Sequence, residues 1–392
     1  MQQQSFRFFV PTVVHFGWNA VADTGRVVRE WGTRCLIVTT SRIYHQTPLI
    51  REIQEQLRGY HVASEVFDGI IPNPTVDVLE QGVAVARTFQ PDVILGVGGG
   101  SSMDAAKAVA LGATHAGSVW DYRLGGEKAI DHPVIPVITV GTTAGTGSQI
   151  SPVSVLTHSG IHSKHAIVDV KLCPKAAIVD PALTVTVPPR VTAATGFDVF
   201  AHAFESTIHS RRSPFTDILA REALTLVVRY LPRAVMNGND REAREAMARA
   251  DTLAGICITN AGTTLPHGIA MAIGGHAPHV MHGEALASVY PEVMKFSWAS
   301  APQAFARLYD IMADPDESSG LTVEAKAQKV SGEIESFLTK IGLRCTLKTL
   351  GVEAGSLPGI IEDTFHLPDY QANPKQPTVE DVNRLVYASF RG

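Results

Sequence analysis

The sequence predicts an α/β domain followed by an all-helical domain. In the first half of the 392-residue chain, short apolar runs alternate with segments of helical spacing, which is typical of a parallel sheet with right-handed crossovers. After the proline pair and threonine cluster at 187–196, period-2 alternation almost disappears and a 3.6-residue spacing takes over. We therefore expect one domain at 1–187 and a second at 188–392, a division that suits a chain of this length.

Buried strands are expected where apolar and β-branched residues run without interruption. The segment CLIVTT at 35–40 has this composition. Residues 91–113 indicate a strand, a glycine turn and a helix in succession. The other strands expected in the first domain are 61–68 and 132–140, and the other helices are 47–57 and 76–89.

The second domain is expected to be helical throughout. Its apolar residues recur every three or four positions, which places them on one face of a helix. Thr378 precedes the last of these segments and is expected to cap it. The expected helices are 215–231, 241–259, 302–312, 323–342 and 378–390.

The composition narrows the class of protein. Hydrophobic residues make up 45% of the chain and charged residues 18%, as in soluble proteins with a large core. The net charge is −5 and no basic run stands out, so we expect no nucleic-acid partner. No apolar stretch reaches a membrane-spanning length, and residues 1–10 lack the pattern of a secretion signal. The four cysteines lie far apart, so we expect free thiols and a cytoplasmic location.

A glycine-rich turn, GVGGGSSMDAAK at 96–107, lies where an expected strand meets an expected helix. Glycines let a backbone approach a phosphate closely, and a helix N-terminus offers free N–H groups with a partial positive charge. The spacing departs from the standard GxGxxG pattern, and a tight turn needs glycine in any case. This motif alone leaves both nucleotide binding and a plain turn open.

A second polar loop, GTTAGTGSQ at 141–149, follows the expected strand 132–140. Open α/β sheets bind ligands at the carboxyl ends of their strands, so two such loops favour a dinucleotide. Thr40 and Arg42 lie at the end of the strand 35–40, where a carboxylate would bind the ribose 2′-hydroxyl of NAD. No carboxylate is present, and Arg42 is able to pair with a 2′-phosphate, which favours NADP and leaves NAD open.

Asp198 and His202 lie four residues apart in GFDVFAHAFES at 196–206. On a helix this spacing puts both side chains on one face, which is how a helix offers two ligands to one metal ion. Glu205, three residues further, would be able to support a ligand by a hydrogen bond. A core Asp–His hydrogen bond, or an N-cap by Asp198, would need the same residues, so the pair alone leaves a metal open.

The segment LPHGIAMAIGGHAPHVMHG at 265–283 contains four histidines. His267 begins an apolar helical run that Gly274 and Gly275 are expected to break, and His282 precedes another helical run. We expect both histidines to lie at the ends of helices and to come together with Asp198 and His202. One oxygen and three nitrogen donors suit Fe²⁺ or Zn²⁺ and not Mg²⁺ or Ca²⁺.

Taken together, these motifs resemble the iron-containing (group III) alcohol dehydrogenase family. The likeness runs nearly end to end, and the ordered set of motifs is far more specific than any single one. Besides the segments above, it includes FGWNA at 16–20, PNPT at 72–75, AAIVDPALT at 176–184 and NPKQPTVED at 373–381.

The resemblance implies a Rossmann-like N-terminal domain and an all-α C-terminal domain, the architecture of dehydroquinate synthase and the group III alcohol dehydrogenases. It implies that the chain is an enzyme, which interconverts a small alcohol and an aldehyde or ketone with NAD or NADP. The metal would be Fe²⁺, with Zn²⁺ as the alternative, and the enzyme a homodimer or higher homo-oligomer. The family's metal ligands fall on Asp198, His202, His267 and His282.

The coenzyme contacts of the family fall on the two loops and on one lysine of this chain. We add Thr40, at the end of the strand 35–40, to this set. The expected cofactor-binding residues are Thr40, Gly98, Gly99, Gly100, Ser101, Thr142, Thr143, Thr146, Ser148 and Lys164.

The chain departs from the family pattern near the expected substrate pocket. Met271 stands where members often carry a further histidine, Met281 where proline is usual, and Gln149 where glutamate is common. The substrate is therefore not predicted. With methionine at 271, His276 and His279 become the candidates for moving a proton, and we take His276 as the candidate catalytic residue.

Three other functions stay open from the sequence. A metal-free reductase of the same superfamily would act on an unsaturated keto acid such as maleylacetate, but it would not need the complete ligand set. A dehydroquinate synthase-like lyase would recycle the nicotinamide within one turnover. A non-catalytic nucleotide- or metal-binding protein would turn over no alcohol or aldehyde.

Overall fold

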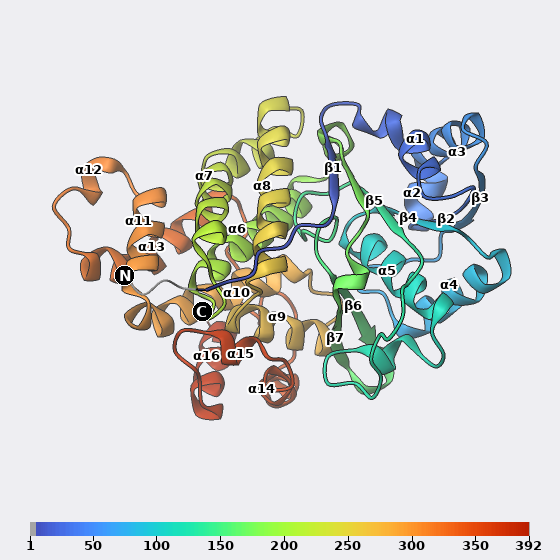
Figure 1. The fold of residues 1–392 in the computed structure, drawn as a ribbon. Coiled ribbons are helices and arrows are strands. Elements are labelled where there is room, and N and C mark those ends of the chain that lie inside the picture. The colour runs from blue at the N-terminus through green and yellow to red at the C-terminus, as the bar shows by residue number, and fades with distance from the viewer. Residues whose placement is uncertain (1–4, 392) are drawn as a thin grey trace. The chain divides into compact units, whose positions relative to one another are not determined.

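The computed structural model describes residues 5–391, which divide into two compact units (Figure 1). One unit is Val10–Val185, and the other combines residues 5–9 with residues 186–391. Residues 1–4, which belong to the segment where no secretion signal is expected, and residue 392 lie outside the described residues. Within residues 5–391, no helix has both the length and the apolar character that crossing a membrane requires.

The α/β unit is built on a six-stranded sheet in which all paired strands run parallel. The strand order is β1-β8-β5-β4-β2-β3. A separate antiparallel pair joins β6 (Val153–His158) to β7 (Ser163–Val168). The strands of the main sheet are β1 (Val13–Phe16), β2 (Arg34–Val38), β3 (Ala63–Phe67), β4 (Val93–Gly98), β5 (Val137–Gly141) and β8 (Ala176–Val179).

Helices cover both faces of this sheet, and Figure 1 shows α1 and α3 apart from α4 and α5. On β2, Cys35 and Ile37 belong to one core, while Leu36 and Val38 belong to the other. Successive side chains of a strand point to opposite faces, so a strand covered on both faces must be apolar throughout. The α-helices are α1 (Thr24–Arg29), α2 (Ser41–Gln46), α3 (Leu49–Gly59), α4 (Val76–Phe89) and α5 (Gly100–Thr114). The 3₁₀ turns are η1 (Ala20–Asp23), η2 (Val119–Tyr122), η3 (Ser159–Ile161), η4 (Val170–Leu172) and η5 (Pro181–Thr184).

The strand order reverses between β2 and β4. The chain runs from β2 outward to β3, returns to β4 beside β2, and then continues through β5 toward the opposite edge. Open α/β sheets bind ligands outside the carboxyl ends of their strands at such a switch point. Thr40, just after β2, and the glycine turn after β4 lie there.

The second unit is a cluster of helices around α6, which is buried along nearly its whole length. It packs against α7, α8 and α10, and its phenylalanines Phe197, Phe200 and Phe204 lie in the core. The α-helices are α6 (Pro189–Ile208), α7 (Pro214–Met236), α8 (Arg241–Asn260), α9 (Leu265–His276), α10 (His282–Ser297), α11 (Pro302–Met312), α12 (Pro315–Ser318), α13 (Val323–Lys340), α14 (Leu357–Thr364), α15 (Asp369–Ala372) and α16 (Val379–Arg391). The 3₁₀ turns are η6 (Trp298–Ser300) and η7 (Ala354–Ser356).

The predicted fold class is confirmed, and two local expectations were wrong. The helix α9 continues through Gly274 and Gly275 to His276, although the glycine pair was expected to break it. Glycine costs a helix about 1 kcal/mol relative to alanine, and here the packing of α9 against α10 and α14 outweighs that cost. The strand expected at 132–140 begins only at Val137, because Pro133 and Pro136 have no N–H to donate to a sheet.

Candidate metal centre and coenzyme loops

Three histidine nitrogens surround one carboxylate oxygen in the helical unit. Asp198 Oδ1 lies 3.5 Å from His202 Nε2, 3.4 Å from His267 Nε2 and 3.9 Å from His282 Nε2. Ligand atoms placed tetrahedrally at 2.0–2.2 Å from a metal ion would lie roughly 3.3–3.6 Å apart. The four side chains therefore have nearly the spacing of one coordination shell.

Helix geometry brings these four side chains together. Asp198 and His202 lie one turn apart on α6, which directs both toward the same side. His267 is the third residue of α9, and His282 is the first residue of α10, after a short connection. Asp198, His267 and His282 offer atoms within 4.8 Å of one another, and the His202 ring stacks on His267 with centroids 4.7 Å apart.

The chemistry of this cluster fits a transition-metal ion. Asp198 Oδ1 and His267 Nε2 are buried and make no hydrogen bond, which is costly unless another charged group satisfies them. Burial opposes ionisation of Asp198, yet the charges of the neighbouring His202, His282 and His267 hold its pKa below the ordinary value. Burial also opposes protonation of His267, yet Glu205 and Asp198 raise the pKa of His267 to about 10. The site favours a positive charge, and one oxygen with three nitrogens suits Fe²⁺ or Zn²⁺.

A buried glutamate holds one of the proposed ligands. Glu205 is fully buried on α6, and its Oε1 accepts a hydrogen bond from His267 Nδ1 at 2.8 Å. Its Oε2 accepts from the backbone N–H of Thr264 at 2.7 Å and from the Thr264 hydroxyl at 3.1 Å. These contacts place a ring proton of His267 on Nδ1 and direct Nε2 toward Asp198, so that Nε2 is the nitrogen available to a metal ion.

The two inner histidines of 265–283 have different partners. His276 Nε2 lies 2.8 Å from Asp363 Oδ2 of α14. Gly359 of α14 makes room for the ring, because a Cβ there would lie 2.5 Å from His276 Cε1. His279 Nε2 lies 3.2 Å from the carbonyl oxygen of Leu350. Sequence reasoning could not find these partners, since they are more than 70 residues away along the chain.

In the α/β unit, the two predicted coenzyme loops lie side by side. β4 pairs with β5 so that Gly98 faces Gly141, and the N–H of Thr142 donates to the Gly98 carbonyl at 2.8 Å. Gly98 has φ +149°, and a Cβ at Gly100 would lie 2.5 Å from Thr146 Cγ2. The glycines are therefore required by the close approach of the second loop as well as by the turn.

The glycine turn ends at a helix N-terminus that no side chain caps. Gly99 is the N-cap of the 15-residue helix α5, and it offers no side-chain oxygen. Ser101 is partly exposed in the first turn, and Thr142 and Thr143 are partly exposed on the adjacent loop. A helix N-terminus with free N–H groups and nearby hydroxyls is suited to a phosphate group.

Ser148, at the end of the second loop, is held inside the protein. Its hydroxyl donates to Asp104 Oδ1 at 2.5 Å and accepts from Lys107 Nζ at 2.9 Å. Lys107 is fully buried, also donates to the carbonyl oxygen of Val153 at 2.7 Å, and has a pKa that burial lowers to about 8. Asp104 and Lys107 were not predicted as site residues, although both belong to the glycine-rich motif GVGGGSSMDAAK at 96–107.

The remaining predicted coenzyme residues also have defined places. Lys164 on β7 is 7% exposed, and its Nζ donates to Asn73 Oδ1 at 2.9 Å. Asn73, which belongs to the motif PNPT but was not predicted as a site residue, has φ +52°. Thr40 caps α2 by accepting the N–H of Ile43 at 3.3 Å, and Arg42 is exposed in the first turn of that helix.

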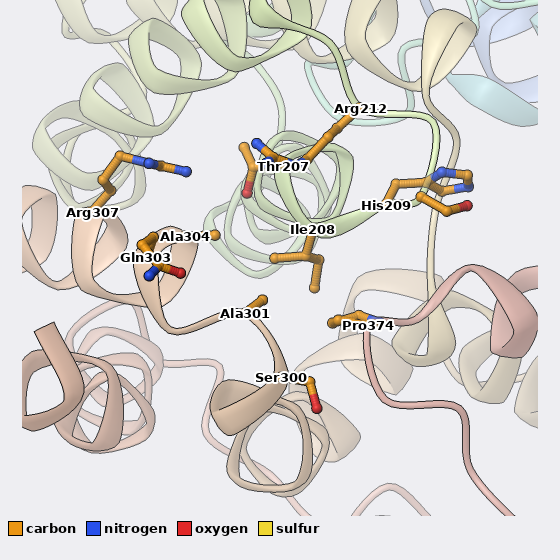
Figure 2. A pocket seen from close by; sticks show the side chains of 11 residues that line it. Thr207, Ile208, His209, Arg212, Ser300, Ala301, Gln303, Ala304, Arg307 and Pro374 are labelled. Atoms are coloured by element: carbon orange, nitrogen blue, oxygen red, sulfur yellow. The ribbon is translucent and has the colours of Figure 1, made fainter. Parts of the chain in front are cut away.

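A polar cavity of about 290 Å³ lies elsewhere in the helical unit (Figure 2). Figure 2 shows Arg212 and Arg307 extending toward Thr207 of α6. Asp217 holds Arg212 through an ion pair of 2.9 Å. None of the residues that line this cavity is among the predicted site residues.

Comparison with known proteins decides the family. Residues 11–181 match the sequence model described as iron-containing alcohol dehydrogenase, and residues 192–390 match the model of the C-terminal part of the same family. The chain belongs to the iron-containing alcohol dehydrogenase family. This membership confirms the resemblance seen in the sequence, and it makes the protein an oxidoreductase that acts on CH–OH groups.

Members of this family with assigned activities are similar over their full length. The chain is 33% identical to the NAD-dependent methanol dehydrogenase of Bacillus methanolicus over 97% of this chain and 98% of the relative. It is 32% identical to the 1,3-propanediol dehydrogenase of Klebsiella pneumoniae over 100% of both chains. Among solved structures, an archaeal alcohol dehydrogenase from a Red Sea brine pool superposes with a TM-score of 0.93 at 32% identity, over 99% of this chain and 100% of that one.

Proposed function

We propose that the protein is a metal-dependent, NAD(P)-linked alcohol dehydrogenase in which Asp198, His202, His267 and His282 hold the metal ion. The observation that carries this proposal is the set of three histidine Nε2 atoms within 3.9 Å of one carboxylate oxygen. Fe²⁺ is the proposed metal because the family is iron-containing, and Zn²⁺ is the alternative because the same donors bind it.

A bound Fe²⁺ or Zn²⁺ supplies Lewis acidity toward an alcohol or carbonyl oxygen. The protein's own contribution is to hold four donors in one shell and to fix their protonation. Glu205 keeps the Nδ1 proton of His267 in place, so that Nε2 faces the shared site. Asp198, with its lowered pKa, stays ionised across the neutral range.

The coenzyme is proposed to bind at the carboxyl ends of β2, β4 and β5. The uncapped N-terminus of α5, with Gly98–Gly100 and Ser101, would receive the pyrophosphate. Thr142, Thr143, Thr146 and Ser148 would bind from the adjacent loop, and Lys164 from β7. NADP is the proposed coenzyme, because Thr40 and the exposed Arg42 follow β2 without a carboxylate.

His276 is proposed to move the proton that alcohol oxidation releases. Its hydrogen bond to Asp363 supports this role, because a carboxylate partner orients an imidazole. The substrate is proposed to be a small alcohol or the corresponding aldehyde or ketone.

The wider setting of the enzyme is also a proposal. We assign coenzyme binding to the domain 1–187 and metal binding to the domain 188–392. Four free cysteines among the described residues support a cytoplasmic enzyme. The exposed edge strand β1, where Val13 is 57% exposed, supports a homodimer or higher homo-oligomer, which light scattering would test.

The decisive experiment is an activity screen of protein reconstituted with Fe²⁺ or Zn²⁺, with NAD(H) and NADP(H) in parallel. The panel includes methanol, 1,3-propanediol, longer alcohols and their aldehydes. We expect net coenzyme turnover that depends on the metal and is faster with NADP(H). The variant His267→Ala is expected to lose bound metal and turnover together.

Other outcomes would point to other functions. Full activity without metal would favour the metal-free reductase, and product formation without net coenzyme consumption would favour the lyase. Normal metal content and activity in His267→Ala would overturn the ligand assignment. Faster turnover with NAD(H) would overturn the coenzyme assignment alone.

A further inference from the structure

A second group of metal-ligating side chains lies in the α/β unit, and the proposed function gives it no role. It consists of His115, the residue that follows α5, with Asp131 and His132 from the segment before β5. His115 Nε2 lies 3.6 Å from Asp131 Oδ1, and His132 Nδ1 lies 2.5 Å from the same oxygen. The three ligand atoms lie within 4.8 Å of one another.

Thr114 contacts one ring nitrogen of each histidine, the nitrogen that does not face Asp131. His115 Nδ1 lies 2.8 Å from the Thr114 hydroxyl, whose own proton points to the carbonyl oxygens of α5, so that Nδ1 carries the ring proton. His132 Nε2 lies 3.1 Å from the Thr114 carbonyl oxygen and must donate to it. Metal-binding histidines usually donate their second ring N–H to such an acceptor. The other ring nitrogen, Nε2 of His115 and Nδ1 of His132, is thus directed toward Asp131.

Nε2 of His115, the nitrogen that faces Asp131, has no hydrogen-bond partner. The side chain of His115 is only 2% exposed, and Nε2 makes no hydrogen bond although a carboxylate oxygen lies 3.6 Å away. A lone pair that faces a carboxylate is repelled by it, and a cation between them removes the repulsion. A proton on His132 satisfies the Asp131 oxygen but leaves His115 Nε2 without a partner. A divalent ion is able to bind all three atoms.

One adjustment is needed for a shared ion. The two rings stack with centroids 3.7 Å apart and planes within 4°, so their lone pairs lie in parallel planes. His132 must tilt to direct Nδ1 at an ion in the plane of His115. Its side chain is 51% exposed, and residues 123–136 form neither helix nor strand, so this tilt breaks no hydrogen bond of a helix or sheet.

We propose that His115, Asp131 and His132 form a site for a divalent transition-metal ion such as Zn²⁺, distinct from the ligand set in the helical unit. Two imidazole nitrogens and one carboxylate oxygen suit Zn²⁺ or Cu²⁺, and water completes the shell. The ion would join the C-terminal end of α5 to the segment that leads into β5. This site does not depend on the proposed function.

The test is a Zn²⁺ titration of the metal-loaded full-length protein by calorimetry, with elemental analysis of every metal before and after. Counting all metals distinguishes added Zn²⁺ from displacement at the first site. We expect a second equivalent in the natural protein and at least tenfold weaker binding of it in His132→Ala. His45→Ala is the matched control, because His45 forms an exposed pair with Asp68 at 3.1 Å that lacks a second histidine.

A spectroscopic measurement reports on the ligands themselves. The electron paramagnetic resonance spectrum of Cu²⁺ added as the second equivalent is expected to show coupling to two imidazole nitrogens. In His132→Ala it is expected to show one, and in His45→Ala still two. The proposal is overturned if the metal-loaded protein takes up no second equivalent, or if His132→Ala binds it as tightly as the natural chain does.

Discussion

Glu205 shows how a single side chain sets the protonation of a proposed ligand. It is fully buried and accepts three hydrogen bonds, one from His267 Nδ1 and two from Thr264. Burial raises the pKa of Glu205, whereas His267 and Thr264 oppose this rise. The ionised form of Glu205 therefore depends on these donors, and the orientation of the His267 ring depends on Glu205.

We predict that Glu205→Gln weakens metal binding by roughly 10- to 100-fold, as is typical when the partner of a ligating histidine is lost. Glutamine has one acceptor oxygen, so its NH₂ group must face either the Nδ1–H of His267 or the donors of Thr264. The metal Kd would be measured by competition with a chelator of known affinity. Glu222→Gln, an exposed change on α7, is the control. Equal affinity in both variants would contradict the role of Glu205.

At the scale of residues, the sequence predicted contacts that follow from a regular period. Asp198 and His202 lie on one face of a helix because four residues make about one turn. Glu205 was expected as a supporting partner for the same reason. Asp363, the partner of His276, could not be predicted, because only the packing of α14 on α9 brings it there.

At the scale of elements, Ser148 joins the second coenzyme loop to α5. Its hydroxyl contacts Asp104 and Lys107, and Asp104 also accepts the N–H of Val155 on β6 at 3.1 Å. One buried cluster therefore fixes a helix, a loop and a strand. The Ser148 hydroxyl was expected to bind the coenzyme. Its hydrogen bonds with Asp104 and Lys107 also hold the loop against α5.

We predict that Ser148→Ala destabilises the coenzyme-free protein by about 1–3 kcal/mol, because it leaves buried charged groups short of a hydrogen bond. Urea unfolding of the α/β unit, without coenzyme, measures this effect. Thr143→Ala on the same loop is the comparison, since Thr143 is partly exposed. If Ser148 served only the coenzyme, the free protein would keep its full stability.

At the C-terminus of α6 lies a buried histidine, His209, whose protonation would destabilise the folded chain. His209 is the C-cap of α6, is 6% exposed, and accepts the N–H of Arg211 at Nδ1, 2.9 Å away. Burial, and to a smaller extent the charge of Arg211, lowers the pKa of His209 to about 4. The unfolded chain, with a histidine pKa of about 6.5, therefore binds more protons than the folded chain between pH 4 and pH 6.5.

We predict that acidification from pH 7 to pH 4.5 costs the helical unit on the order of 1–3 kcal/mol through this one group. The stability is present above pH 6.5 and is lost as the pH falls toward 4. His209→Asn keeps an acceptor for Arg211 but does not titrate, so its urea midpoint is expected to fall less on acidification. His366→Asn, an exposed change, serves as the control. Identical pH profiles for the natural chain and His209→Asn would exclude this contribution.

Elements with a strong period were predictable, and short or atypical ones were not. The helix expected at 76–89 is α4 with those bounds, because its apolar stripe is uninterrupted. β1 and β8 are only four residues long, too short to display a period, and β6 and β7 form an antiparallel pair outside the main alternation. Pairing of β1 with β8 and of β8 with β5, rather than local sequence, defines the two short strands of the main sheet.

At the scale of the whole molecule, the two units have separate cores and separate ligand sets. The α/β unit packs two apolar layers against its sheet, whereas the helical unit packs around α6. All four proposed metal ligands lie on α6, α9 and α10 of the helical unit. A metal ion there is expected to stabilise that unit alone.

We predict that, in the His132→Ala variant, which lacks the second proposed metal site, removing the metal with a chelator lowers the unfolding temperature of the helical unit and leaves that of the α/β unit unchanged. A ligand that binds only the folded state stabilises it by RT ln(1 + [L]/Kd), which is about 2.7 kcal/mol at 100 times the Kd. Calorimetry with and without chelator would separate the two transitions. In the same His132→Ala background, Asp198→Ala is expected to melt as the metal-free protein does and to show no response to added metal. His279→Ala, made in the same background at an exposed histidine of the same segment, is expected to respond as its parent does, because His279 is not a proposed ligand and its Nε2 lies 3.2 Å from the backbone carbonyl of Leu350. A chelator response that persists in Asp198→Ala would place the stabilising ion at other residues.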